Sequence, residues 1–436
     1  MALRWSLWFE KQKNDIAMRF DTVIIGGGLA GLVCGIRLAQ QGERCAIVSL
    51  GHSALHFSSG SLELLGALPD GEKVCSPAEA FSKLVEVAPS HPYAKFSRER
   101  FLALAEQGAQ LMRDAGVDVY GSVERNHYRL SPTGAMKPAW LTFDGYVHSP
   151  NEDALPWRSV ALFNAEGFLD FYTQFLGDSM RRMGTQCHAY TFNLPELETI
   201  RENPTEMRSA NIARIFDKAE TLDALAGAIA SQLGDEEAVL LPAVLGVDCR
   251  DGVKRLERRL NRPVAVVATL PPSVPGLQAQ TLLRRYFQEL GGVYMLGDSA
   301  VGYKAEGDNI THLYTVNHGD IPFMAKNFVL ATGSFFSGGL MADKDRVREP
   351  LFGADVWQLP TRGEWYDRDL FRDQAYERFG VMTDDEFRAM RGGRSIENLY
   401  VIGAALSGFN AVKEGCGAGV SILTAIDVAE RIKCKK

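Results

Sequence analysis

The sequence predicts an α/β protein in which a parallel sheet is covered by helices and a second α/β domain is inserted into the first. Three observations support this class. Residues 19–50 show a strand-like run, a glycine-rich loop and a helix-like run. Residues 160–297 alternate between apolar strands and amphipathic helices, and apolar strands that end in glycine return at 327–333 and 397–403. The pattern therefore indicates one sheet that the chain leaves and later re-enters.

The first element is a βαβ unit. Residues 20–25 are apolar and β-branched, which is typical of a buried strand. A helix is expected over 29–41, ended by Gly42, and a second buried strand over 44–48. Between strand and helix stands G-x-G-x-x-G, which in this setting predicts a Rossmann-type nucleotide site.

The glycines of this loop have separate predicted roles. Gly26 permits the tight turn, Gly28 removes a Cβ where a phosphate approaches, and Gly31 lets the helix pack on the strand. The helix N-terminus offers free N–H groups to the anion. A glycine-rich turn without a ligand is the alternative. The predicted nucleotide-binding residues of the loop are Gly26, Gly27, Gly28, Leu29, Ala30 and Gly31.

One expected group is missing. Dinucleotide sites usually carry Asp or Glu about 20 residues past the loop, bound to the adenosine ribose. Here Ser49-Leu50 occupies that place, and no carboxylate follows until Glu63. Either a neutral group such as Ser49 holds the ribose, or no adenosine is bound, which would suit FMN.

Composition narrows the function classes. The chain has 436 residues, 46% hydrophobic and 23% charged, which describes an ordinary soluble globular protein of two or three domains. Its net charge is −7 without a long basic run, so nucleic acid is not an expected partner. No apolar run reaches 18 residues, so no transmembrane segment is expected.

The N-terminal segment 1–17 is predicted to be a tail. Arg4, Glu10 and Lys11 interrupt any signal-peptide core. A disordered tail is the simpler interpretation, and a short interfacial helix that uses Trp5 and Trp8 is the alternative.

Cysteine usage suggests a reducing cytosol. The seven cysteines are scattered, without a C-x-x-C pair. This spacing argues against an internal iron–sulfur cluster, and no metal site is expected. A protein of this kind that moves electrons must pass them to a small molecule or to another subunit.

A small polar loop follows the βαβ unit. Ser58, Ser59, Gly60 and Ser61 are expected to precede a helix and to lie against a cofactor, with a capped helix start as the alternative. Residues 76–98 contain three prolines and suggest a domain boundary. A helix is expected over 98–115, followed by short strands and loops to 160.

The inserted region has its own alternating order. Strands are expected at 160–163, 186–192, 238–241 and 264–268, and helices at 168–183, 205–217, 220–233, 251–260 and 275–290. A β-meander over 292–316 should then lead to a strand at 327–331. The predicted division is a tail (1–17), a first domain (18–76 and 285–436) and an inserted α/β domain (77–284).

Three glycine-bearing strand ends are expected to meet at one sheet edge, where ligands of parallel α/β sheets bind. Their residues are Gly26 to Gly31, Thr332 with Gly333, and Gly403 with Gly415, Gly417 and Gly419. The combination resembles flavoproteins of the glutathione-reductase-type Rossmann class. That class commonly has a carboxylate after the late glycine, where this chain has Ala404.

Longer strings resemble a narrower family, the B subunits of anaerobic glycerol-3-phosphate dehydrogenases, over about residues 19–430. The strings are residues 19–35, Ser53-Ala-Leu-His-Phe-Ser-Ser-Gly-Ser-Leu, Thr269-Leu-Pro-Pro-Ser-Val, Gly333-Ser-Phe-Phe-Ser-Gly-Gly-Leu, Arg348-Glu-Pro and Thr361-Arg-Gly-Glu-Trp-Tyr. The resemblance implies a flavoprotein with FMN (alternative FAD). It implies two partners, namely a larger FAD-bearing A subunit and a membrane-associated iron–sulfur C subunit.

The implied assembly oxidises sn-glycerol 3-phosphate to dihydroxyacetone phosphate and passes electrons to quinone. It would lie on the cytoplasmic side, peripheral at the inner face of the cell inner membrane through its partners. Two alternatives stay open. One is a stand-alone FAD-dependent reductase of the fumarate-reductase-like type, and the other is a non-catalytic scaffold with a degenerate flavin site.

Candidate catalytic residues are few. His56 stands beside the loop Ser58–Ser61, which we call the flavin-side loop, and is the best-placed base. A hydrogen-bonding role outside the reaction is nevertheless the favoured interpretation. Arg348 and Arg362 could hold a phosphate, but ion pairs with Glu349 or Glu364 are slightly favoured. We therefore expect the FAD-bearing partner to carry the alcohol chemistry and this chain's flavin to relay electrons.

Overall fold

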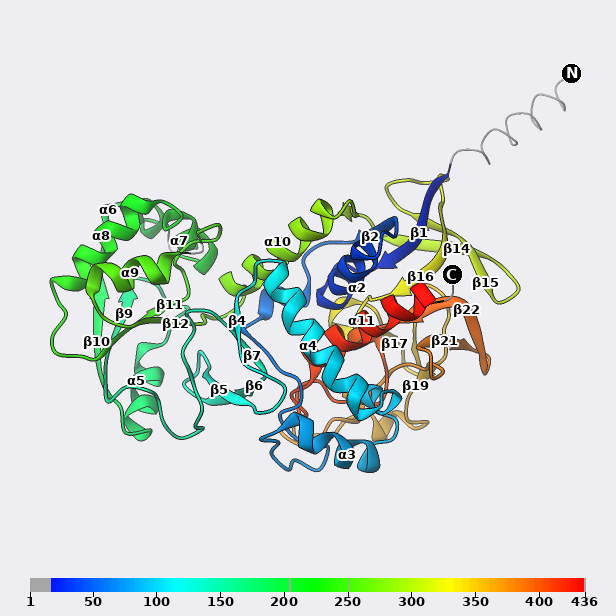
Figure 1. Cartoon of the computed structure of the whole chain (residues 1–436), viewed down its shortest axis with the longest axis horizontal. Coiled ribbons are helices and arrows are strands. Elements are labelled where there is room, and N and C mark those ends of the chain that lie inside the picture. The colour runs from blue at the N-terminus through cyan, green and yellow to red at the C-terminus, as the bar shows by residue number, and fades with distance from the viewer. Residues whose placement is uncertain (1–16, 204, 250, 435–436) are drawn as a thin grey trace, which may run out of the picture.

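The computed structural model describes residues 17–203, 205–249 and 251–434. The expectations for the tail, apart from residue 17, lie outside these ranges. The described residues form two hydrophobic cores. Figure 1 shows the two sheets around which they form lying side by side. One core surrounds the sheet that contains β1, and the other surrounds the sheet that contains β9.

The first sheet has the strand order β13-β2-β1-β16-β15-β14, and β22 also pairs with β16. Strands β13, β2, β1, β16 and β22 run parallel, so their carboxyl ends lie along one edge, whereas β15 and β14 form an antiparallel hairpin. The bounds are β1 Met18–Ile25, β2 Cys45–Ser49, β13 Val293–Leu296, β14 Ala300–Glu306, β15 Asn309–Thr315, β16 Phe323–Leu330, β21 Arg388–Arg391 and β22 Arg394–Val401.

Register places the glycine-bearing ends together. Ile25, the last residue of β1, lies opposite Leu330 of β16 and Val48 of β2. Leu330 in turn lies opposite Val401 of β22. The loops that follow these strands must therefore meet at one edge, as the sequence predicts.

A layer of helices packs over this sheet (Figure 1). Helix α2 (Leu29–Gln40) packs against α11 (Gly417–Cys434) and α10 (Val274–Glu289), and α4 (Arg98–Asp114) packs on α11. Figure 1 shows α2, α4 and α11 lying over the sheet next to one another. Helix α3 (Pro77–Val87) begins with Pro at its first turn and is capped by Ser76.

The second sheet is four-stranded and parallel, in the order β10-β9-β11-β12. Strands β9, β11 and β12 are mostly apolar and buried, as expected for a sheet covered by helices, whereas the edge strand β10 carries exposed polar residues such as Gln186 and His188. The bounds are β9 Ser159–Ala165, β10 Gln186–Phe192, β11 Ala238–Pro242, β12 Val264–Val267, α5 Thr173–Arg182, α6 Pro195–Arg201, α7 Ser209–Ile215, α8 Ala219–Ala230 and α9 Gly252–Leu260.

Short strands and 3₁₀ turns complete the chain. They are η1 Ala54–Phe57, β3 Ser61–Leu62, η2 Pro92–Lys95, β4 Val119–Tyr120, β5 His127–Leu130, β6 Met136–Ala139, β7 Leu141–Phe143, β8 His148–Ser149, η3 Phe335–Ser337, β17 Met341–Ala342, β18 Val347–Arg348, β19 Val356–Trp357, η4 Arg362–Glu364, η5 Ala375–Arg378, β20 Gly380–Val381 and η6 Gly403–Ala405. Within the ranges described, no helix is long and apolar enough to cross a membrane.

Two local predictions are wrong. Ser58 to Ser61 does not lead into a helix, because Ser61 begins β3 and pairs with Thr142 of β7. The alternative interpretation of this loop, a capped helix start at Ser59 or Ser61, is therefore excluded. The expected three-stranded meander over 292–316 is a hairpin of β14 and β15 alone, since β13 runs parallel to β2.

The inserted unit is smaller than the predicted 77–284. Phe81 of α3 and Phe101 of α4 belong to the first core, although both helices fall within that range. Leu283 and Phe287 of α10 also belong to the first core. Helix α4 packs against α11, α10 packs against α2, and α3 packs on α4. Because α11 and α2 are distant in sequence from α4 and α10, local periodicity could not assign these helices.

Candidate functional site

The glycine loop has the geometry that its sequence predicts. Gly26 has φ +115°, and a Cβ there would lie 2.2 Å from the carbonyl oxygen of Ala331. A Cβ on Gly31 would lie 1.9 Å from the carbonyl oxygen of Gly26, so the helix packs directly on the turn. At Gly28 only the Cβ of Ser53 comes within 4 Å, at 3.6 Å. The loop is therefore tight on its inner side and open at Gly28.

The N-terminus of α2 is available to an anion. Its N-cap residue, Gly28, provides no side-chain hydrogen bond, and the first turn carries no acidic residue. Its free N–H groups and the helix dipole favour a phosphate at this end. Leu29 and Ala30 form the start of this turn, as expected from the sequence.

The other two glycine-bearing ends lie against the first. Ala331 and Thr332 adjoin Gly26, and a Cβ on Gly403 would lie 2.7 Å from the Cβ of Ala30. Gly333 has φ +76°, which its turn into η3 requires. The three segments thus form one cradle along the sheet edge, and the hydroxyl of Thr332 is buried there without a hydrogen-bond partner among the residues that the structure describes.

Two side chains, the predicted Ser49 and the unpredicted Tyr294, close the glycine loop at the end of β2. Ser49 is buried, and its hydroxyl donates to the carbonyl oxygen of Gly51 at 3.2 Å. The hydroxyl of Tyr294, on β13, donates to the carbonyl oxygen of Gly27 at 3.2 Å. A Cβ on Gly27 would lie 2.1 Å from that hydroxyl and 2.5 Å from the Ser49 Oγ. No sequence signal could place Tyr294 here, because it comes from a strand that is distant along the chain.

The flavin-side loop is held from several directions. The Ser58 Oγ accepts a hydrogen bond from the Gly60 N–H at 3.3 Å, and the Ser58 carbonyl accepts one from the Ser273 hydroxyl. Gly60 has φ +80° and lies against the ring of Tyr146. Ser59 lies between these anchors and is partly exposed.

A buried guanidinium supports the same loop. The Nε of Arg129, on β5, donates to the Ser61 hydroxyl, and that hydroxyl donates to the Glu63 carboxylate at 3.2 Å. An Nη of Arg129 lies 3.7 Å from Glu63, and burial lowers the pKa of Arg129. The other Nη is buried without a hydrogen-bond partner. The sequence offered no signal for Arg129, because no motif marks it.

The start of α11 approaches the same loop. The Gly419 N–H donates to the carbonyl oxygen of Glu63, and the Gly66 N–H donates to that of Glu414, both at 2.8 Å. Gly415 has φ +55°. A Cβ on Gly419 would lie 2.2 Å from the hydroxyl of Tyr93, so this glycine is required for packing. Gly417 adjoins Ala411, and Ala404 is half-buried in η6.

Beside this helix end lies a buried cluster of His91, Glu414 and Cys416. His91 Nδ1 accepts the Tyr93 N–H at 3.0 Å, so a neutral ring carries its proton on Nε2, which faces Glu414 at 3.5 Å. Burial lowers the pKa of His91 and raises the pKa of Cys416. The ring and the thiol thus stay neutral, and both are placed to donate to the Glu414 carboxylate, from Nε2 at 3.5 Å and from Sγ at 3.9 Å.

His56, on η1, turns toward α10. It is buried, its ring lies 4.5 Å from that of His52, and its side chain hydrogen-bonds Gln280. Burial and then His52 lower its pKa, and the bond to Gln280 opposes them.

Arg348 and Arg362 do not make the predicted ion pairs. Glu349 is buried and accepts the N–H groups of Leu351 and Phe352 at 2.9 and 2.7 Å. Arg362 donates to the carbonyl oxygen of Asp343 and lies over the ring of Trp365. Both arginines are exposed. Glu349 therefore binds backbone N–H groups instead of the Arg348 guanidinium, a pairing that the sequence could not reveal.

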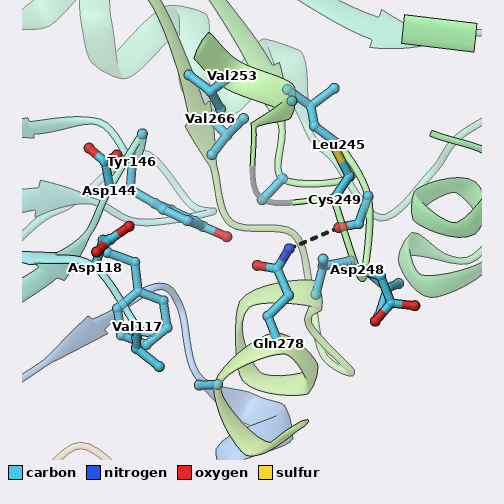
Figure 2. Close-up of a pocket in the computed structure, with 18 of the residues that line it drawn as sticks. Val117, Asp118, Asp144, Tyr146, Leu245, Asp248, Cys249, Val253, Val266 and Gln278 are labelled. Atoms are coloured by element: carbon cyan, nitrogen blue, oxygen red, sulfur yellow. Dashed lines mark hydrogen bonds between the residues drawn. The ribbon is translucent and has the colours of Figure 1, made fainter. Parts of the chain in front are cut away.

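A separate cavity of about 340 Å³ lies where the two cores adjoin. Figure 2 shows Tyr146 and Gln278 directed toward one another across it, with Gln278 donating to the carbonyl oxygen of Gly246 at 2.9 Å. Asp118, Asp144, Asp248 and Glu257 line it, and the glycine loop does not. Lys254, which pairs with Asp144 at 2.8 Å, and Arg285 also line it. Because none of the residues of the glycine loop lines this cavity, we treat it as separate from the cradle.

Comparison with known proteins finds FAD-binding relatives. Residues 21–420 match the family model described as FAD binding domain. A Yersinia enterocolitica protein, named as the B subunit of anaerobic glycerol-3-phosphate dehydrogenase, is 46% identical over 416 residues, which cover 95% of this chain and 98% of that protein. A protein of the same name from Actinobacillus succinogenes is 39% identical over 424 residues, covering 95% and 99%.

Solved structures show more distant likeness. The 3-ketosteroid delta1-dehydrogenase of Sterolibacterium denitrificans is 12% identical, with a TM-score of 0.45, over 96% of this chain and 100% of that one.

Proposed function

This chain belongs to the FAD binding domain family and to the family of anaerobic glycerol-3-phosphate dehydrogenase B subunits, and from this premise we propose its role within such a dehydrogenase. It is a flavin-dependent oxidoreductase subunit. The assembly would oxidise sn-glycerol 3-phosphate to dihydroxyacetone phosphate and pass the electrons on through partner subunits. The observation that supports this proposal most directly is the cradle, in which three glycine-bearing strand ends meet at the uncapped N-terminus of α2.

The residues present suit a flavin phosphate. Gly28 leaves room for it, and the first turn of α2 offers N–H groups without a competing side chain. Thr332 brings a buried, unpartnered hydroxyl to the same edge. When bound there, a flavin supplies an acceptor for hydride or electrons, while the chain binds, orients and shields it. The full proposed set is Gly26–Gly31, Ser49, Ser58–Ser61, Thr332, Gly333, Gly403, Ala404, Gly415, Gly417 and Gly419.

We propose FMN as the resident flavin, although the family model is one of FAD binding. An adenosine ribose normally needs a carboxylate at the end of β2. Here the Ser49 hydroxyl is committed to Gly51, and Leu50 points to solvent. The Tyr294 hydroxyl also crosses from β13 to Gly27 and fills space on that side of the loop. A mononucleotide has no adenosine and so needs no ribose contact at this end of β2. Ser49 stays in the proposed set through its place beside Gly27.

We assign the oxidation of the alcohol to a partner subunit. The flavin of this chain is assigned the relay of electrons. His56 turns to Gln280, which suits the positioning of η1 better than the removal of a substrate proton. Arg348 and Arg362 are exposed rather than gathered around a reacting carbon. We further propose that the partners are an FAD-bearing A subunit and an iron–sulfur C subunit, and that the latter holds the assembly at the inner face of the membrane.

The test is to purify the chain with its companion subunits and to identify the released flavin by mass. One FMN for each copy of this chain, beside FAD on the companion, is expected. The isolated chain loaded with flavin should reduce a dye with glycerol 3-phosphate far more slowly than the assembly does. A colourless chain would contradict the flavin site, and a rate equal to that of the assembly would contradict the relay role.

A further inference from the structure

The cavity at the junction of the two cores is large enough for a small molecule. Its volume of about 340 Å³ lies within the range of ligand pockets, roughly 300–1,000 Å³. Its wall comes from both cores, since Phe143 belongs to the first and Val266 to the second. Ligand pockets are often found where two structural units meet. The place and the size of the cavity are therefore those of a binding site.

Buried apolar side chains form part of the wall. Val117, Leu245 and Val274 are buried and reach the cavity from three different segments of the chain. A water molecule in a protein interior needs about two to four polar partners, which side chains of this kind do not offer. This part of the cavity is therefore suited to the apolar body of a ligand.

Two polar side chains face the interior and have hydrogen-bonding groups that the protein leaves free. Tyr146 packs against both cores, and the neighbouring Val147 N–H donates to the carbonyl oxygen of Val266 at 3.0 Å. Its hydroxyl makes no hydrogen bond with the described residues, and burial raises the pKa of Tyr146, so the hydroxyl stays protonated. Gln278 lies opposite (Figure 2); its amide nitrogen donates to Gly246, and its amide oxygen has no partner within the described ranges.

Acidic side chains surround the one lysine of the cavity. Lys254 pairs with Asp144 at 2.8 Å, and the Asp144 N–H donates to the carbonyl oxygen of Asp118 at 3.0 Å. The bond to Asp144 and the charges of Asp118 and Asp251 raise the pKa of Lys254. A single ammonium group thus faces three carboxylates, so negative charge remains in excess on the side of the cavity that Tyr146 lines.

The remaining charged residues of the cavity do not reverse this balance. Asp248 is exposed and makes no side-chain hydrogen bond or ion pair with the described residues, and Glu257 accepts the Val264 N–H at 3.2 Å. Arg285 is exposed on α10. Four acids and two bases line the cavity, so its potential favours a cation over an anion. They are Asp118, Asp144, Asp248, Glu257, Lys254 and Arg285.

We propose that this cavity is a binding site for a small organic cation. The apolar body of the ligand would lie between the two cores, and its N–H groups would donate to the Gln278 amide oxygen, the Tyr146 hydroxyl oxygen and the carboxylates. Acceptors without a protein partner prevail around the cavity, so a ligand rich in donors complements it and a phosphate or carboxylate does not. The site is additional to the proposed flavin cradle, and its test needs no flavin signal.

The test is isothermal titration calorimetry of the full chain with three ligands that share one ring and differ in charge. Benzamidine is a cation with N–H donors, benzamide is neutral and benzoate is an anion. We expect benzamidine to occupy a single saturable site at least about tenfold more tightly than benzoate, with benzamide between them. The difference should narrow as salt is added, because the carboxylates are partly exposed.

A charge-removing variant tests the acids. Asp118→Asn/Asp248→Asn should weaken benzamidine about tenfold and leave benzamide within about threefold, because only the cation uses the charge. The matched control is Glu196→Gln/Asp235→Asn, which removes the same charge from two exposed residues of the inserted unit that do not line the cavity. This control should bind all three ligands as the wild type does.

A space-filling variant tests the location. Val253→Phe extends a side chain that lines the cavity, and it should weaken benzamidine and benzamide at least about tenfold. The melting temperature of each variant establishes that it is folded, and the paired Asp variant decides the matter if Val253→Phe is not. Benzoate that binds as tightly as benzamidine would overturn the inference. So would the lack of saturable benzamidine binding up to about 10 mM, or full affinity in a folded Val253→Phe protein.

Discussion

At the scale of single residues, the glycines of the cradle differ in what a side chain would meet. A methyl group on Gly28 meets only Ser53, at an ordinary van der Waals distance, whereas one on Gly31 would overlap the Gly26 carbonyl. Gly42 has nothing within 4 Å but has φ +83°. Substitutions at these positions therefore test three different effects, namely ligand binding at Gly28, packing at Gly31 and backbone strain at Gly42.

We expect Gly28→Ala to weaken flavin binding at least tenfold while the melting temperature of the flavin-free protein shifts by only a few degrees. The reason is that its Cβ enters the space left for the phosphate and touches little protein. Fluorescence titration with FMN and thermal unfolding measure the two effects. Equal flavin affinity in wild type and variant would place the phosphate elsewhere.

Gly31→Ala should instead damage the fold, by about 3 kcal/mol or more, because the Cβ would lie 1.9 Å from backbone. Gly42→Ala should cost about 1 kcal/mol, from its positive φ alone. Denaturant unfolding of the two variants makes the comparison. A smaller loss at Gly31 than at Gly42 would show that helix and strand do not pack as described.

His127 makes a pH prediction. It is buried, and burial, followed by nearby His148, lowers its pKa to about 4. Between about pH 6.5, the ordinary pKa of histidine, and pH 4, the unfolded chain binds a proton that the folded chain does not, so the free energy of unfolding falls as the pH is lowered. Each unit of difference between the two pKa values corresponds to about 1.4 kcal/mol, so the free energy of unfolding falls by about 3 kcal/mol across this pH range.

Unfolding of wild type and His127→Gln from about pH 7 to about pH 4 measures this contribution, with His52→Gln at an exposed position as the control. The His127 variant should show the shallower decline. Identical slopes in all three proteins would mean that His127 is not the group responsible.

At the scale of elements, a close helix contact lies between α4 and α11. A Cβ on Gly108 would lie 2.5 Å from the Cγ2 of Ile422. This contact brings α4 onto the first core, and α11 in turn starts at the cradle. The position of α4 therefore supports the helix end that faces the flavin-side loop.

Gly108→Val should destabilise the protein by about 1–3 kcal/mol through overpacking, and Ile422→Ala by about 2–5 kcal/mol through a cavity. Together they should cost less than the sum, since the added methyl groups enter the space that Ile422 leaves. A double-mutant cycle by denaturant unfolding measures the coupling. Strict additivity would place the two residues apart.

At the scale of the whole molecule, two cores share one chain. Leu162 of β9 is buried in the second core, and Ile24 of β1 is buried in the first. The contacts that join the two parts include Tyr146 against Gly60 and Gln278 to Gly246. We therefore expect the second core to unfold locally while the strands that end at the cradle stay paired.

We expect Leu162→Ala to lower stability by about 2–5 kcal/mol and to increase amide exchange over 159–267. Exchange in β1, β2 and β16 should change little. Hydrogen-exchange mass spectrometry distinguishes this from a single cooperative unit, in which protection would fall throughout the chain.

The cradle itself follows largely from sequence. Strand, loop and helix of the βαβ unit are encoded by local apolar runs and glycine spacing, and the late glycines sit at the ends of apolar strands. The parallel sheet then brings these ends together, because parallel strands share a carboxyl edge. The roles assigned to Gly26 and Gly31 follow from the same spacing.

By itself, then, the sequence determined the fold class, the family and the predicted place of the flavin, because these depend on contacts a few residues apart and on recognisable strings. Only the tertiary structure placed Tyr294 on Gly27, Arg129 on Ser61 and the α4 helix in the first core. It also turned Glu349 to backbone amides and left Arg348 exposed. Such pairings join residues that local periodicity does not relate, so they are decided only when the sheet and its helices have packed.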